Sequence, residues 1–250
     1  MVLIEVCVDS LESAIRAFRG GADRLELCAN LGLGGGTTPS LGLFNAVHRA
    51  LPAIPIMVMI RPRVGDFCYS SLEFDVMIED IKLFRKAGAT GVVAGVLAKD
   101  GAIDVARMRT LTAQAGPGLH SLQAVQQIPG ITRILTSGHG LVAPSEPHAL
   151  SSLLAFASTM TILPGSGINA VTVGPLLDAL LPYGLREIHL SGGGWVDNGT
   201  ENRKPGFGMG IGESEWGVWK TDEEKVRAVK RIVEEKVKEF ESRGPGPMAM

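Results

Sequence analysis

Two short apolar segments of this sequence carry the same pattern, a glutamate followed two positions later by a cysteine. The pairs are Glu5 with Cys7 and Glu26 with Cys28. Aliphatic residues alternate with them in both segments, which is typical of a strand whose two faces differ. A buried carboxylate needs a cation, a proton or a metal, and a thiolate is a soft metal ligand. The pattern therefore points to acid–base or metal chemistry.

The two segments predict two neighbouring strands of a parallel barrel. The outer face of such a strand packs on helices and is apolar, so charged residues within the strand point into the lumen. We expect Glu5 and Glu26 side by side in the lumen, with Cys7 and Cys28 side by side one layer nearer to the mouth. Packing alone is an alternative for the two thiols, because free cysteine is among the most buried residue types.

A histidine and an arginine are expected to join these residues. The last predicted strand neighbours the first in a closed barrel, and its alternation places His189 inward. Arg61 ends the third predicted strand and is the expected partner of the two glutamates. The candidate catalytic residues are therefore Glu5, Glu26, Arg61 and His189, and the candidate metal ligands are Cys7 and Cys28.

Glycine-rich turns follow the last two predicted strands, where barrel enzymes often bind phosphate through backbone N–H groups. Such turns are also needed simply to leave a strand. The candidate anion-binding residues are Arg61, Arg63, Gly165, Gly167 and Gly192. The sequence contains no CxxC, HExxH or HxH metal-binding motif and no Walker loop. It also lacks a nucleophile elbow, so a nucleophilic hydrolase is disfavoured.

The elements that must position these residues alternate between strand and helix patterns, which predicts an α/β fold of the TIM (β/α)-barrel type. Seven strands are predicted, at residues 3–8, 24–28, 54–62, 91–97, 131–138, 160–167 and 185–192. Helices are predicted between and after them, at residues 13–18, 40–51, 74–88, 104–116, 151–157, 171–181 and 221–240, with Asp9 as the cap of the first. Residues 118–130 have room for a helix but for no strand, so the barrel is incomplete and lacks its fifth strand. We expect one domain over residues 1–243 and a disordered tail at 244–250.

Composition excludes several classes of protein. The 250 residues carry 24 basic and 26 acidic side chains. The sequence therefore lacks the excess of basic residues that binds nucleic acid or an anionic membrane surface. No apolar run approaches the roughly 20 residues that span a bilayer. The N-terminal segment lacks the features of a signal peptide, and three cysteines are too few for a disulfide scaffold. We expect reduced thiols.

Seven segments resemble the copper homeostasis protein CutC family: EVCVDS (5–10), GGADRLELCANL (20–31), TPSLGL (38–43), MIRPRVGDFCYS (59–70), GVLAKDGAIDVARMR (95–109), RILTSG (133–138) and HLSGG (189–193). The resemblance covers nearly the whole chain up to about residue 236. It implies a TIM-type barrel, a cytoplasmic location, a homo-oligomer and a role in copper handling, with Cu(I) bound by the strand-end cysteines Cys7 and Cys28 at the barrel mouth.

One departure from the family lies between the fourth helix and residues 133–138. The family carries there a fifth strand ending in His-Arg-Ala-Phe-Asp, whereas this sequence has GLHSLQAVQQIPG. His120 lies beside the gap but outside that motif, so the role of the family's histidine is not carried over to it. The sequence resembles the family on both sides of the missing segment, which a skipped exon or an incorrect gene model would explain.

Two alternatives stand beside copper binding. The first is a barrel enzyme acting on a small anionic or phosphorylated substrate, with Glu5 or Glu26 as acid or base and Arg61 holding the anion. The second is an inactive truncated variant of the family, because the loss of a central strand removes ladder hydrogen bonds.

Overall fold

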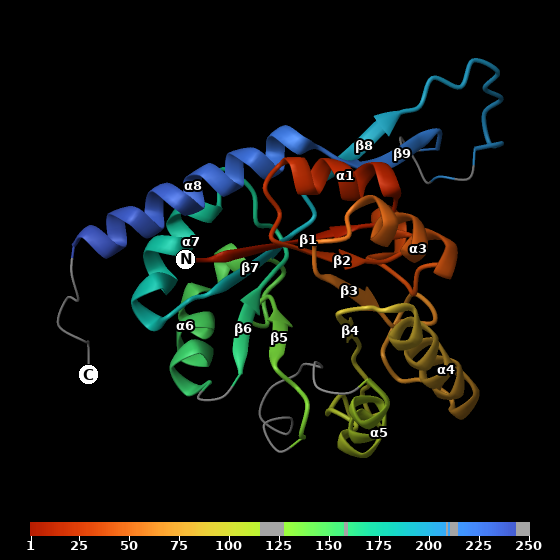
Figure 1. Cartoon of the computed structure of the whole chain (residues 1–250), viewed down its shortest axis with the longest axis horizontal. Coiled ribbons are helices and arrows are strands. Elements are labelled where there is room, and N and C mark those ends of the chain that lie inside the picture. Colours follow the sequence, from red (N-terminus) through yellow and green to blue (C-terminus); the bar gives the residue numbers. More distant parts are fainter. Residues whose placement is uncertain (116–127, 158–159, 209, 211–214, 244–250) are drawn as a thin grey trace.

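The computed structural model describes residues 1–115, 128–157, 160–208, 210 and 215–243. Strands and helices alternate along the chain, and the helices surround the strands (Figure 1). All seven predicted strands are present: β1 (Leu3–Val8), β2 (Arg24–Leu27), β3 (Ile56–Met59), β4 (Gly91–Val93), β5 (Arg133–Thr136), β6 (Thr161–Pro164) and β7 (Glu187–Leu190). The predicted helix at 121–127 and the predicted disordered tail at 244–250 lie outside the described residues.

Seven helices correspond to predicted ones: α1 (Leu11–Arg19), α3 (Leu41–Ala50), α4 (Ser71–Ala87), α5 (Val105–Ala115), α6 (Pro147–Phe156), α7 (Val173–Leu180) and α8 (Glu223–Ser242). The short helix α2 (Leu31–Gly34) and the 3₁₀ turns at Ala143–Ser145 and Leu181–Tyr183 were not predicted. The predicted cap of α1 was wrong. Ser10, not Asp9, caps this helix by accepting a hydrogen bond from the backbone N–H of Ser13. The Asp9 carboxylate instead accepts from the N–H of Leu31, at the start of α2.

The parallel strands fall into two sheets. One has the order β4-β3-β2-β1-β7, and the other pairs β5 with β6. Within the described residues no ladder joins β4 to β5 or β6 to β7. The fold is thus α/β and of TIM type, and its described strands form no closed ladder.

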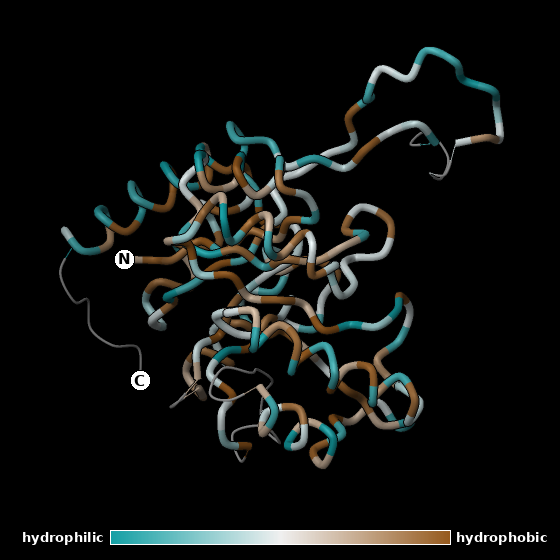
Figure 2. Tube along the Cα trace, turned by 45° about the vertical axis from the view of Figure 1, so that its right-hand side comes forward, coloured by the Kyte–Doolittle hydropathy of each residue, from teal (hydrophilic) through white to brown (hydrophobic). Residues whose placement is uncertain are grey.

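The core lies between the strands and the surrounding helices. On β1, Ile4, Val6 and Val8 are fully buried on the outer face, as the alternation predicts. The last helix, α8, buries Val226, Val229 and Val233, whose spacing of three and four residues forms one helical stripe. Figure 2 shows the corresponding alternation of hydrophilic and hydrophobic turns along this helix.

An antiparallel hairpin follows β7. Its strands are β8 (Gly193–Asp197) and β9 (Gly217–Thr221), with Trp195 paired directly opposite Trp219. The described part of the hairpin projects away from the body of the protein (Figure 1). Among the described residues, none of the helices combines the length and apolarity that a membrane crossing requires.

Candidate functional site

The register of β1 determines which residues of the site lie level with one another. Glu5 is paired with Arg24 on β2 and with His189 on β7, whereas Cys7 is paired with Glu26. The predicted layers, glutamate beside glutamate and thiol beside thiol, were therefore wrong. Alternation fixes which face a residue occupies, but neighbouring barrel strands are staggered, and a shift of two residues keeps the face while changing the level.

Glu5 has a different cationic partner from the one predicted. The Arg24 side chain donates from Nε to Glu5 Oε2 at 2.5 Å and from a terminal nitrogen to Glu187 Oε2 at 2.6 Å. Arg133 on β5 also donates from Nε to Glu187, at 2.8 Å. Two guanidinium groups and two carboxylates thus form a charge-balanced chain from β1 through β2 and β7 to β5. Burial of such charges is tolerated only when they are paired.

Arg61 does not neutralise either glutamate. Its guanidinium donates to the backbone carbonyls of Gly34, Gly36 and Gly65, at 2.7 to 3.0 Å. It therefore holds together the loops that follow β2 and β3. Arg63, another candidate anion-binding residue, forms ion pairs with Asp66 and Glu73 on the surface.

His189 joins the two glutamates of the lumen. Its Nδ1 lies 2.8 Å from Glu5 Oε1, and its Nε2 lies 3.8 Å from Glu26 Oε2. Burial alone would raise the pKa of Glu5, but the bonds to His189 and Arg24 outweigh burial and lower this pKa to about 2. Burial opposes the charged imidazole ring, but Cys7, Glu26 and Glu5 around it hold the pKa of His189 well above its usual value. Each of the two groups thus favours the charged form of the other.

Glu26 has the opposite character to Glu5. Burial, assisted by the negative charge of Glu5, raises the pKa of Glu26 to about 7 against the opposing effects of His189 and Arg24. Within the described part of the chain, its Oε1 atom is buried and has no hydrogen-bond partner. This carboxyl is poised to gain or lose a proton near neutral pH, as an acid–base catalyst must.

The two strand thiols lie at different depths in this arrangement. Cys7 Sγ, a ring nitrogen of His189 and a carboxylate oxygen of Glu26 lie within 4.8 Å of one another, a spacing that could hold a metal ion. Cys28 is fully buried two residues after Glu26, directly beyond the end of β2, and its thiol donates to the carbonyl of Val8 at 3.5 Å. Burial raises the pKa of both thiols, so each must release a proton before it can bind a metal.

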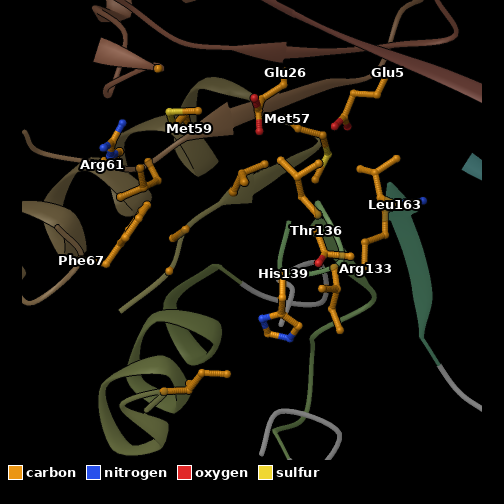
Figure 3. A pocket seen from close by; sticks show the side chains of 18 residues that line it. Glu5, Glu26, Met57, Met59, Arg61, Phe67, Arg133, Thr136, His139 and Leu163 are labelled. Carbon is orange, nitrogen blue, oxygen red and sulfur yellow. The ribbon is translucent and has the colours of Figure 1, made fainter. Parts of the chain in front are cut away.

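A cavity of about 450 Å³ opens beside Glu26, between β3 and β4 on one side and β5 on the other. Glu5 and Glu26 point into it from one wall, Met57 and Met59 lie beside them, and Arg61 and Phe67 lie at the far end (Figure 3). Among the described residues, the cavity thus lies where no ladder joins β4 to β5.

A second cavity, of about 760 Å³, lies over the carboxyl ends of β6 and β7. Cys7 and His189 are part of its lining, together with the candidate anion-binding residues Gly167 and Gly192. The third candidate glycine, Gly165, has its N–H engaged with the carbonyl of Thr136 and is not free to bind an anion.

Arg24 and Arg133 were missed by the sequence analysis, whereas Glu187 is placed inward beside His189 by the alternation of the last predicted strand but was given no role. The signal for Arg24 was present, because it lies two positions before Glu26 and therefore on the same inward face. Glu187 has the same parity as His189. A charged residue within a buried strand is a candidate for the lumen whichever end of the strand it occupies.

The fold and the site together define a TIM-type barrel whose lumen holds a buried cluster of carboxylates, an imidazole and a thiol. Residues 2–194 match the CutC family. The chain belongs to this family, which is named for copper homeostasis.

Relatives and solved structures agree with this assignment. A CutC family protein of Chromobacterium violaceum is 39% identical over 247 residues, which cover 93% of this chain and 98% of the relative. The crystal structure of CutC from Streptococcus agalactiae matches with a TM-score of 0.68 and 29% identity, over 76% of this chain and 99% of that one. Thiamine phosphate pyrophosphorylase from Pyrococcus furiosus matches with a TM-score of 0.56 and 12% identity, over 94% and 97% of the two chains, and shows a likeness of fold alone.

Proposed function

We propose that this protein acts in copper homeostasis in the cytoplasm by binding Cu(I) as its cargo at Cys7 and Cys28. The observation that carries the proposal is the group formed by Cys7 Sγ, His189 and Glu26, whose ligand atoms lie within 4.8 Å of one another. Cys28 lies outside this group, two residues beyond Glu26 on the neighbouring strand, and is proposed as a second soft ligand, which favours Cu(I) over harder metals. Membership of the CutC family supports the copper role, and it alone carries the accompanying proposal of a homo-oligomer.

A competition titration tests the copper site. Reduced protein is titrated anaerobically with Cu(I) in the presence of a chromogenic chelator, and the Cys7→Ser and Cys28→Ser variants are compared with Cys68→Ser. Cys68 is half-buried outside the cluster and donates to the carbonyl of Ala98, so it is the matched control. Because even the loss of a supporting contact weakens metal sites by about 10–100-fold, losing a ligand should weaken binding by about 100-fold or more.

The pH dependence sharpens this test. The pKa values of both thiols are raised by burial, so Cu(I) must displace protons and affinity should increase with pH. Equal affinity in the Cys7→Ser and Cys68→Ser variants would contradict the proposal, as would binding that does not depend on pH.

A second candidate function, acid–base catalysis on a small anionic substrate, is favoured by Glu26. A carboxyl with a pKa of about 7, an unpartnered oxygen and a cavity in front of it is suited to carry a proton to or from a bound molecule. Glu5 remains ionised and orients His189, while Arg24 holds Glu5 in place. Turnover of small carbonyl and phosphorylated compounds should fall about 100-fold or more in Glu26→Gln. Unchanged turnover in that variant would remove Glu26 from the reaction.

A further inference from the structure

The second cavity differs from the first in the charge of its lining. The first cavity is lined by both carboxylates and arginines, including Glu5, Glu26, Arg61 and Arg133. Among the described residues that line the second, none carries a carboxylate, and Lys225 contributes an ammonium group. A hollow with a cation and without a competing anion favours a negatively charged ligand.

The loop after β6 presents backbone donors to this cavity. The N–H groups of Ser166, Gly167 and Ile168 donate to no acceptor within the described part of the chain. The carbonyls of the loop are engaged, because Ser166 accepts from the N–H of Ala143 and Gly167 accepts from the side chains of Asn169 and Thr172. The loop is thus fixed through its acceptors while three consecutive donors remain free.

Backbone conformation adds to this picture. Ser166 has a φ of 75°, in the left-handed region that costs a residue with a side chain of order 1–3 kcal/mol. A Cβ on the adjacent Gly167, whose φ is 72°, would lie 2.7 Å from the side chain of Val142. The loop therefore holds a shape that sequence preference alone disfavours, and this shape leaves its N–H groups free.

The loop after β7 faces the same cavity from the neighbouring strand. Within the described residues the N–H groups of Ser191 and Gly192 also donate to no acceptor. Within the described ranges, the Nζ atom of Lys225, on the first turn of α8, makes only a long contact of 3.4 Å to the carbonyl of Gly193. Two loops and one ammonium group thus converge on one hollow, whose inner wall includes Cys7 and His189.

From this juxtaposition we infer that the cavity over β6 and β7 binds the phosphate group of a phosphate monoester through the N–H groups of Ser166, Gly167, Ile168, Ser191 and Gly192 and the ammonium of Lys225. A phosphate monoester carries about 1.5 to 2 negative charges and three acceptor oxygens, which suits many donors better than a carboxylate does. The inference rests on the second candidate function and narrows its substrate class, because a phosphate held there places the rest of the molecule beside His189.

Isothermal titration calorimetry at constant ionic strength tests this site, with inorganic phosphate and acetate as probes. Phosphate should bind at least about tenfold more tightly than acetate, since each charge-assisted bond is a strong one. Lys225→Gln removes the ammonium, and Asn169→Asp adds a negative charge to the lining while retaining the oxygen that accepts from the N–H groups of Val171 and Thr172. Each variant should weaken phosphate binding by about tenfold.

Matched controls come from the same chain. Lys238→Gln changes an exposed lysine on the same helix, and Asn198→Asp changes an exposed asparagine outside the cavity, so both should bind phosphate as the unmodified protein does. Thermal unfolding curves that superimpose would show that the variants are folded. Absence of phosphate binding, equal affinity for acetate, or full affinity in Asn169→Asp would each overturn the inference.

The outcome is separable from that of the second candidate function. Phosphate binding without turnover of any phosphorylated compound would remove the catalytic candidate and leave the phosphate site in place. Turnover of an unphosphorylated compound by a protein that does not bind phosphate would overturn the phosphate site alone.

Discussion

The two sheets differ in how completely they are enclosed. In the five-stranded sheet, every residue of β2 and β7 is buried, and β1 is exposed only in part at its first residue. In the two-stranded sheet, Leu135 on β5 is 39% exposed although it lies within a strand. The groups nearest to His189, namely Glu5, Glu26 and Cys7, come from β1 and β2, and Arg133 on β5 joins the site only through Glu187. The candidate site is therefore built mainly by the five-stranded sheet, the continuous side of the barrel.

The largest expected effect is the loss of Arg24 from the continuous side. Arg24→Met leaves Glu5 and Glu187 buried without their shared cation, and removing one partner of a buried pair costs about 3–5 kcal/mol. Arg133→Met is the matched control, because Arg133 is 27% exposed and Glu187 keeps its bond to Arg24, so we expect a loss nearer to about 1 kcal/mol. Urea unfolding measures both. Equal losses of unfolding free energy in Arg24→Met and Arg133→Met would contradict a greater dependence of the five-stranded sheet on these ion pairs.

The next effect compares one leucine from each sheet. Leu27 on β2 is fully buried, and Leu27→Ala should lower the free energy of unfolding by about 3 kcal/mol. Leu135→Ala should lower it by less than about 1 kcal/mol, because that side chain already contacts solvent. A larger loss at Leu135 would contradict an open lumen beside β5.

The smallest effect depends on pH. The pKa of Glu26 is raised from 4.5 to about 7 in the folded protein, so ionising this group costs stability as pH rises through that interval. Glu26→Gln lacks this cost, and its stability relative to the unmodified protein should increase by about 2 kcal/mol between pH 4 and pH 6. Glu79→Gln, at an exposed helix position, is the control and should show no such change. The test measures the unfolding free energies of Glu26→Gln and the unmodified protein at a series of pH values. A difference between the two proteins that does not change with pH would show that the pKa of Glu26 is not raised.

The sequence predicted the strands, their faces and the convergence of Glu5, Glu26, Cys7 and His189, because a period of two in an apolar segment fixes the direction of each side chain. It did not predict the level at which these residues meet. That level depends on the stagger between strands, which is a property of the whole barrel. The same limit explains why Arg61 was predicted as the partner of Glu5 in place of Arg24. Both arginines have the inward parity, but they lie at different levels along the barrel axis.

The bond between His189 and Glu5 has a consequence for the making of the protein. It joins residues 184 positions apart, so the first strand leaves the ribosome long before the strand that completes its charge partners has been synthesised. Until β7 arrives, Glu5 and Arg24 lack His189 and Glu187. Assembly of the site is thus a late event of folding, and a nascent chain that stops before β7 cannot form it.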